Sequence, residues 1–234
     1  MAMLEVKDLQ VYYGMIQAIK GISFEVNQGE VIALIGANGA GKTTLMGLLC
    51  GIQQPTHGKI TLNGRTIEAL GADYRKMLGY LPQNFGYYPE FKVWDFLLYV
   101  AALKGLSRAK AEEKSGEMLK VTGLMSEKAH KIKNLSGGMK RRLGIAQAML
   151  NEPEILILDE PSAGLDPGER RRFGHLIQNF SKGRIILIST HIVSDVEKTA
   201  DRIIMMKAGR VIYAGENREN LEDFYFDYFR RNEE

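Results

Sequence analysis

The chain has 234 residues, a net charge of +3 and a single cysteine, Cys50, which excludes an intrachain disulfide and fits a reducing compartment. The charge is too small to argue for a nucleic-acid partner by itself. The apolar runs fall far short of the ~20 residues that cross a bilayer, and no signal-peptide pattern opens the chain. We therefore expect a soluble chain, held at a membrane only by another protein, with Cys50 as a small buried residue.

Short strand-like runs alternate with helical patterns along most of the chain. The runs "VIALIG", "ILILD" and "IILIST" are continuously apolar, which is typical of strands covered on both faces of a sheet. The alternation predicts an α/β fold with a mainly parallel central sheet, preceded by an antiparallel edge layer, and "KAGR" predicts a hairpin turn. Helical spacing fills residues 93–129. We predict one domain, with an α/β core at 1–84 and 154–234 and a helical subdomain at 85–153.

The segment "GANGAGKTT" follows the first buried strand and opens a helix, and it fits the phosphate-loop pattern G-x-x-x-x-G-K-[ST]. Glycines in this pattern turn backbone N–H groups toward phosphates, the lysine adds a positive charge, and the threonine hydroxyl ligates Mg²⁺. The helix N-terminus adds its dipole. A phosphate loop alone does not choose among kinases, GTPases, helicases and ATPases. The predicted binding residues are Gly36, Ala37, Asn38, Gly39, Ala40, Gly41, Lys42, Thr43 and Thr44.

Two further stretches carry chemistry. In "NLSGGM", Ser136 and the glycines after it open a helix, which makes a second anion site. "ILILDEP" ends a buried strand in two acids, which are rarely buried without a partner. We expect Asp159 to orient, through water, the Mg²⁺ held by Thr43, and Glu160 to act as general base on the attacking water. The plainer alternative is that Asp159 caps a turn.

These motifs, in this order, resemble the ATP-binding subunits of ATP-binding cassette (ABC) transporters. "LSGGM" at 135–139 looks like the family signature LSGGQ, with Met139 in place of glutamine. The resemblance implies that Gln83 of "YLPQ" senses the metal and the γ-phosphate. It also implies that Asp166 of "SAGLD" belongs to a loop at the nucleotide, and that His191 of "STH" contacts the γ-phosphate.

The same resemblance implies how nucleotide is held. Tyr13 of "VYYG" matches the aromatic residue that stacks on adenine, with Tyr12 as the neighbouring alternative. Two copies close head to tail around two ATP molecules, and Ser136 and Gly138 of one copy complete the γ-phosphate site of the other. The partner is a second copy or a homologous subunit. The chain lacks the NKxD motif of guanine-nucleotide proteins, so ATP is the expected nucleotide.

The implied function is an Mg²⁺-dependent ATPase that drives transport through a separate polytopic permease, on the cytoplasmic face of the cell membrane. The chain looks most like the ATPases of ABC-2-type exporters; the cargo is set by the permease. The alternative is a soluble ABC ATPase that acts on nucleic acid or ribosomes. The short spacing between Gln83 and Ser136 leaves no room for an inserted coiled coil, and no basic stripe suggests nucleic acid.

Three segments allow two interpretations each. An aromatic group after Gln83 either docks the permease or fills the core of the helical subdomain: Tyr87, Tyr88, Phe91, Trp94 and Phe96. Trp94 and Phe96 are better suited to the core. A C-terminal helical face is expected to dock on the chain's own core rather than on a partner: Leu221, Phe224, Tyr225 and Tyr228. "KRR" at residues 140–142 is interpreted as a solvated helix face rather than a lipid contact, with Arg142 as the family arginine.

Overall fold

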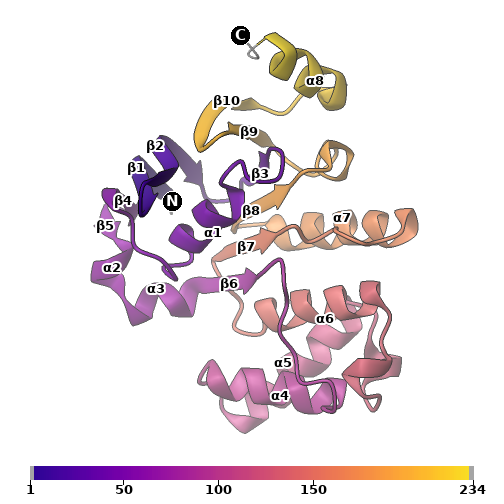
Figure 1. Ribbon diagram of the computed structural model, residues 1–234. Coiled ribbons are helices and arrows are strands. Elements are labelled where there is room, and N and C mark those ends of the chain that lie inside the picture. The colour runs from indigo at the N-terminus through magenta and orange to yellow at the C-terminus, as the bar shows by residue number, and fades with distance from the viewer. Residues whose placement is uncertain (1–2, 232–234) are drawn as a thin grey trace.

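The computed structural model describes residues 3–231 and arranges them as two β-sheets and a helical region (Figure 1). The larger sheet has six strands in the order β10-β9-β3-β8-β7-β6. Neighbours from β9 to β6 run parallel, and β10 pairs antiparallel with β9. The strands are β3 (Val31–Ile35), β6 (Leu78–Leu81), β7 (Ile155–Asp159), β8 (Ile185–Thr190), β9 (Arg202–Lys207) and β10 (Arg210–Glu216).

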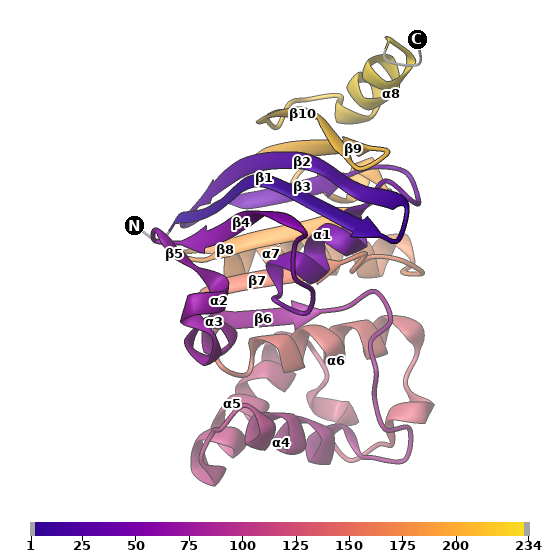
Figure 2. The same cartoon turned by 60° about the vertical axis from the view of Figure 1, so that its left-hand side comes forward.

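The smaller sheet is antiparallel, in the order β2-β1-β4-β5. Helix α1 (Lys42–Leu49) contacts β2 of this sheet and also β7 and β8 of the larger one, so it lies between the two sheets (Figure 2). The predicted mainly parallel central sheet and antiparallel edge layer are therefore both confirmed. The strands are β1 (Met3–Tyr13), β2 (Ile16–Asn27), β4 (His57–Leu62) and β5 (Arg65–Thr66).

The continuous apolar runs are explained by the two faces of the larger sheet. Residues 31, 33 and 35 of β3 join one buried cluster with α6 and α7, whereas Ile32 and Leu34 join the other with α1 and the smaller sheet. Every residue of β3, β7 and β8 is buried. Cys50 is buried beside α1, as expected.

The helical region lies at the opposite end of the molecule from β10 and the C-terminal helix (Figure 1). Its helices are α4 (Val93–Leu103), α5 (Arg108–Val121) and α6 (Gly137–Met149), with 3₁₀ turns at Met125–Glu127 and Ile132–Asn134. The remaining helices are α2 (Ile67–Leu70), α3 (Ala72–Met77), α7 (Pro167–Ser181) and α8 (Leu221–Arg231), with a 3₁₀ turn at Val193–Asp195. Across residues 3–231, every helix is too short or too polar to cross a membrane.

The C-terminal helix docks on the chain's own core, as predicted. Leu221 is fully buried in the same cluster as α7, and three aromatic residues of α8 pack against that cluster: Phe224, Tyr225 and Tyr228. The ring of Tyr213 on β10 lies 5.0 Å from that of Phe224 and 5.7 Å from that of Tyr228. The aromatic tail is thus part of the fold.

Because β3, β6, β7 and β8 are parallel, the segments that leave their carboxyl ends emerge at one edge of the sheet. The phosphate loop follows β3, the Gln83 segment follows β6, Glu160 follows β7 and His191 follows β8. The topology alone therefore brings four of the predicted functional segments together.

Candidate functional site

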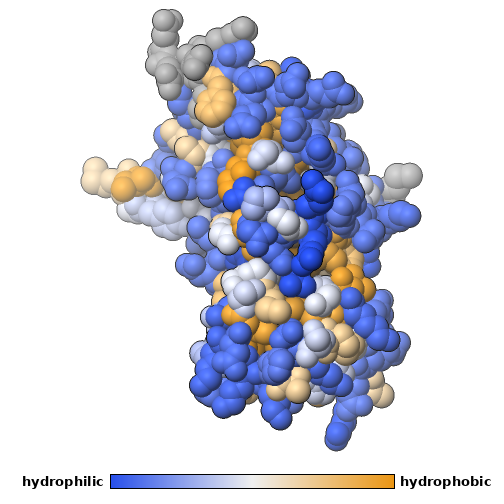
Figure 3. All heavy atoms as spheres, turned by 90° about the vertical axis from the view of Figure 1, so that its right-hand side faces the viewer, coloured by the Kyte–Doolittle hydropathy of each residue, from blue (hydrophilic) through white to orange (hydrophobic). Residues whose placement is uncertain are grey.

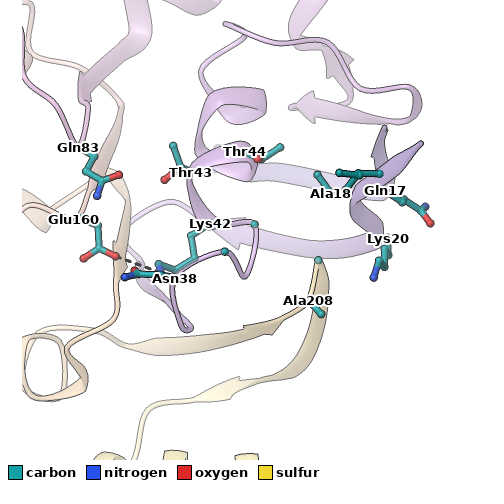
Figure 4. Close-up of a pocket in the computed structure, with 14 residues that line it drawn as sticks. Gln17, Ala18, Lys20, Asn38, Lys42, Thr43, Thr44, Gln83, Glu160 and Ala208 are labelled. Carbon is teal, nitrogen blue, oxygen red and sulfur yellow. Dashed lines mark ion pairs between the residues drawn. The ribbon is translucent and has the colours of Figure 1, made fainter. Parts of the chain in front are cut away.

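A cavity of about 510 Å³ opens at this edge of the sheet (Figure 4). Its walls come from the phosphate loop (residues 36–44), β2, the β9–β10 turn and the ends of β6 and β7. The predicted residues that line it are Asn38, Gly39, Gly41, Lys42, Thr43, Thr44, Gln83 and Glu160. The other lining residues were not predicted: Ile16, Gln17, Ala18, Lys20, Ala208 and Gly209. The predicted residues thus meet around the phosphate loop, where phosphates are expected to bind.

Two glycines of the phosphate loop, Gly36 and Gly41, are required by close approaches. Gly41 has a φ of +102°, and a Cβ there would lie 3.1 Å from the carbonyl oxygen of Ala18. A Cβ on Gly36 would lie 2.5 Å from the carbonyl oxygen of Met206. Helix α1 then begins at Lys42 without a side-chain hydrogen bond at its N-cap. Its first N–H groups therefore remain available to an anion.

Lys42 is held by its own loop and by Glu160. Its Nζ donates to the carbonyl oxygens of Gly36 at 2.7 Å and Ala37 at 3.2 Å, and lies 3.3 Å from Glu160 Oε1. The side chains of Lys42 and Glu160 are only 6% and 4% exposed, and they point toward each other in Figure 4. A bound γ-phosphate would compete with these oxygens for the ammonium group.

The other oxygen of Glu160 faces His191. Oε2 lies 2.8 Å from His191 Nδ1, so the carboxylate is placed between a lysine and an imidazole. Glu160 also has a φ of +48°, a conformation that a non-glycine residue adopts only when its surroundings hold it there. Five other non-glycine residues of the described chain also have a positive φ, so it is the two partners of the carboxylate, rather than its backbone, that set Glu160 apart.

Ser189, in β8, holds both acids and was missed by sequence reasoning. Its hydroxyl donates to Asp159 Oδ1 and accepts a hydrogen bond from the Glu160 N–H at 3.0 Å. The available signal was a serine inside the apolar run "IILIST". A buried hydroxyl there needs partners, and the neighbouring strand β7 supplies them.

The residues expected to hold Mg²⁺ fit that ion. Asp159 is fully buried, and its Oδ2 has no hydrogen-bond partner among the residues that the structure describes. Thr43 and Gln83 line the cavity, as does Glu160, the residue that follows Asp159 in the chain. Within the described chain, no three His, Cys, Asp or Glu side chains gather as a metal cluster. Mg²⁺ takes one or two protein ligands and completes its shell with water and phosphate, and the buried Asp159 Oδ2, which accepts no hydrogen bond from the described residues, suits it.

The predicted adenine platform lies outside the lining of the cavity. Tyr13 is 49% exposed, and its hydroxyl donates to Gln53 Oε1 at 2.6 Å; Tyr12 is 43% exposed. Neither ring lines the cavity, which begins at Ile16 on this side. Both tyrosines remain candidates, since either ring is free to stack on a base.

Tyr13→Ala is expected to weaken ATP binding by about 1–2 kcal/mol, a typical loss for one stacking aromatic. Tyr13→Phe keeps the ring and removes only the hydroxyl that bonds Gln53, so it should bind almost as wild type does. Titration with a fluorescent ATP analogue measures both. If Tyr12→Ala is the variant that loses affinity and Tyr13→Ala is not, the platform is Tyr12.

Three predicted residues at the starts of α6 and α7 also lie away from the cavity lining, and so do Gly36, Ala37, Ala40, Asp159 and His191. Ser136 is the N-cap of α6, and its Oγ accepts from the Met139 N–H at 3.1 Å. Asp166 is the N-cap of α7, and its Oδ1 accepts from the Glu169 N–H at 2.9 Å. A Cβ on Gly138 would lie 3.1 Å from Glu169 Cγ. Within one copy these residues do not join the cavity around Lys42.

The interpretation of residues 140–142 as a solvated face is wrong for Arg141. Its guanidinium group is half-buried, burial lowers its pKa, and it donates hydrogen bonds to backbone carbonyl oxygens. The acceptors are the carbonyls of Pro82, Gln83, Glu160 and Pro161. Arg142 instead lies 3.2 Å from Glu169 Oε2 and donates to the Thr122 carbonyl at 2.8 Å.

The ABC transporter family model matches residues 19–163. The uncharacterized ABC transporter ATP-binding protein YxlF of Bacillus subtilis is 44% identical over 93% of this chain and 72% of its own length. The Nod factor export ATP-binding protein I of Rhizobium etli is 34% identical over 95% and 71%. A solved dimeric, post-hydrolysis structure of the ATP-binding cassette MJ0796 bound to ADP and Pi superposes with a TM-score of 0.83 and 25% identity, over 92% of this chain and 99% of that one.

The family match includes the phosphate loop, Gln83, the α6 N-terminus and Glu160, and the structural similarity extends over nearly the whole chain. Sequence motifs, fold and cavity therefore agree. The chain belongs to the ABC transporter family, as an ATP-binding subunit that hydrolyses ATP to drive transport.

Proposed function

We propose that Glu160 is the general base for ATP hydrolysis in a two-copy nucleotide sandwich, and that this reaction powers export through a separate polytopic permease. The observation that carries the proposal is the placement of one buried carboxylate 3.3 Å from the phosphate-loop lysine and 2.8 Å from His191. Buried carboxylates are rare without such partners, and this one lines the cavity beside the phosphate loop.

In the proposed reaction the phosphate loop and Lys42 bind the β- and γ-phosphates. Glu160 leaves its ion pair with Lys42 and accepts a proton from the attacking water, whose oxygen bonds to the γ-phosphorus as the bond to the bridging oxygen breaks and ADP leaves. His191 moves to the γ-phosphate. Thr43 and Gln83 would ligate Mg²⁺, with Asp159 acting through water, and the bound ion would supply positive charge to the phosphate oxygens. The N–H groups at the start of α1 stabilise negative charge without reorganisation during the reaction.

The sandwich accounts for the residues that lie outside the cavity. Ser136 is exposed at the N-cap of α6, and Asp166 caps α7. Asp166 accepts from the Glu169 N–H and Pro167 has no N–H, so an anion is favoured only by the N–H groups at the start of α6. A second copy, or a homologous subunit, would bring its nucleotide to them and shield the γ-phosphate from water.

Ser136→Arg is expected to abolish hydrolysis while leaving ATP binding to the isolated chain nearly unchanged, because Ser136 serves the opposite copy's nucleotide. A steady-state phosphate-release assay and a binding titration separate the two effects. Mixing Ser136→Arg with Lys42→Ala should restore at most one working site per pair. Loss of ATP affinity in the monomeric Ser136→Arg variant would contradict this division of labour.

The permease is proposed to dock on the helical region, residues 85–153, at an exposed aromatic cluster. The ring of Tyr88 lies 4.9 Å from that of Phe91 and 5.7 Å from that of Tyr99. Tyr88 is 51% exposed and Tyr99 is 39% exposed. Partly exposed aromatic rings of this kind suit an interface anchor. Phe96, in contrast, is buried in the core.

Two other aromatic residues of the segment after Gln83 pack against the core. Trp94 packs against the core, with Lys128 Nζ 3.6 Å from its ring centroid. Tyr87 is also packed against the core. On the face shown in Figure 3, hydrophobic residues form a band just below the middle of an otherwise largely hydrophilic surface, with a smaller group above it. The cytoplasmic, membrane-peripheral location that we propose follows from docking on such a permease.

Affinity capture from detergent-solubilised membranes tests the proposal. A tagged chain with Glu160→Gln, held in the presence of ATP, should recover a polytopic membrane protein. The paired variant Tyr88→Ala/Tyr99→Ala should recover much less of it while keeping its ATP affinity. Recovery of ribosomes or nucleic acid instead, with no polytopic protein, would overturn the transport assignment in favour of a soluble ABC ATPase.

A further inference from the structure

Helix α6 approaches the Gln83 segment unusually closely, and Gly144 permits it. A Cβ on Gly144 would lie 2.6 Å from Leu81 Cδ1 and 3.3 Å from the ring of Phe85. A larger residue would have to displace the side chain of Leu81. Further along α6, Gln147 Nε2 donates to the carbonyl oxygen of Tyr80 at 3.1 Å. The helix is thus fastened along the strand that leads to Gln83.

Arg141 lies one turn before Gly144 and so faces the same side. Its Nη1 donates to the carbonyl of Gln83 at 2.8 Å and to that of Pro82 at 3.3 Å. Its Nε donates to the carbonyl of Pro161 at 3.2 Å, and its Nη2 donates to that of Glu160. One planar fork therefore joins three elements: α6, the segment after β6 and the segment after β7.

The bond to Glu160 reaches a strained residue. Glu160 has a φ of +48°, which persists only where neighbouring contacts over-determine it. On one side its N–H donates to the carbonyl of Ser189 at 3.1 Å and to the Ser189 hydroxyl at 3.0 Å. On the other side its carbonyl accepts from Arg141. Ser189 and Arg141 together hold the peptide units on either side of the left-handed conformation.

We propose that Arg141 is a positioning residue for the reaction. It fixes the main chain of Glu160 to helix α6, so the position of the base depends on the position of the start of α6. Helix α6 is continuous over 13 residues, from Gly137 to Met149, and carries Ser136 at its N-cap. Engagement of Ser136 by the partner's nucleotide is thereby transmitted to this copy's own base. The inference rests on the proposed role of Glu160.

Arg141→Met is expected to lower kcat by about 10²-fold, because small displacements of a catalytic group cost about that much. ATP affinity of the isolated chain should stay close to wild type, since Arg141 does not line the cavity. Arg141→Lys keeps the charge but lacks the fork that spans both segments, so kcat should fall with little change in Tm. The control, Arg171→Met, changes an exposed arginine on α7 and should behave as wild type.

A double-mutant cycle with Glu160→Gln separates positioning from general structural support. Residues that act as a unit are strongly non-additive, so Arg141→Met should cost far less in single-turnover rate once the base is gone. If Arg141→Met does not fold, the same cycle is run with Arg141→Lys. An equal fold-loss in both backgrounds, or an unchanged kcat in the single variants, overturns the positioning role. Wild-type turnover by Glu160→Gln alone would instead remove the premise, the role of Glu160 as base.

Discussion

Glu160→Gln is expected to lower ATP turnover by about 10²–10⁴-fold, the usual contribution of a general base. Glutamine keeps the size and one oxygen of the side chain but cannot accept the proton. The same change removes the carboxylate that lies 3.3 Å from Lys42 Nζ, so the lysine loses a competitor to the γ-phosphate. ATP affinity of the isolated chain should therefore stay equal to that of wild type or rise.

The measurement is phosphate release at saturating ATP, with a parallel binding titration. Glu222→Gln is the matched control, because Glu222 is exposed on α8, far along the chain from the site. It should hydrolyse at the wild-type rate. A Glu160→Gln protein with wild-type turnover, or with strongly weakened ATP binding, would show that the carboxylate has a different role.

Lys42→Ala is expected to abolish hydrolysis and weaken ATP binding strongly, because Lys42 is the cation built into the phosphate loop. The structure adds a second effect. Removing one partner of a buried ion pair costs about 3–5 kcal/mol of stability, since the other charge is left buried. Glu160 still has His191 at 2.8 Å as a partner, so we expect a destabilisation at the lower end of that range, seen as a lower Tm.

The two effects of Lys42→Ala can be separated. In Lys42→Ala/Glu160→Gln the uncompensated carboxylate is gone, so Tm should recover while ATP binding and hydrolysis should not. Lys110→Ala, on the exposed face of α5, is the control for loss of a lysine. Thermal unfolding and an ATP titration measure both quantities. If Lys42→Ala retains wild-type turnover, the phosphate-loop assignment is wrong.

The fold and the phosphate loop could be predicted because their signals are local. The apolar runs of β3, β7 and β8 give buried parallel strands directly, and the phosphate-loop pattern lies within nine residues of the chain. The parallel pairing then brings the loop and Glu160 to one edge, with no long-range detail required. Local sequence patterns were therefore enough to predict which edge of the sheet carries the cavity.

Arg141 could not be predicted, because its role depends on tertiary docking. An arginine in "KRR" at the start of a helix is typical of a solvated face, and its acceptor in the Gln83 segment lies 58 residues away in the chain. Only the close packing of α6 at Gly144 brings that carbonyl within reach. The aromatic cluster shows the same limit: Tyr99 joins Tyr88 and Phe91 only once α4 is in place.

The central claim is that ATP joins two copies and that hydrolysis, initiated by Glu160, releases them. Size-exclusion chromatography with light scattering on Glu160→Gln tests it most directly, in ATP, in ADP and without nucleotide. The account predicts a dimer in ATP alone, because the γ-phosphate completes contacts to the partner's Ser136 and Gly138, and loss of that dimer when Ser136→Arg is added. A Glu160→Gln protein that remains monomeric at saturating ATP, or that dimerises equally in ADP, would contradict it.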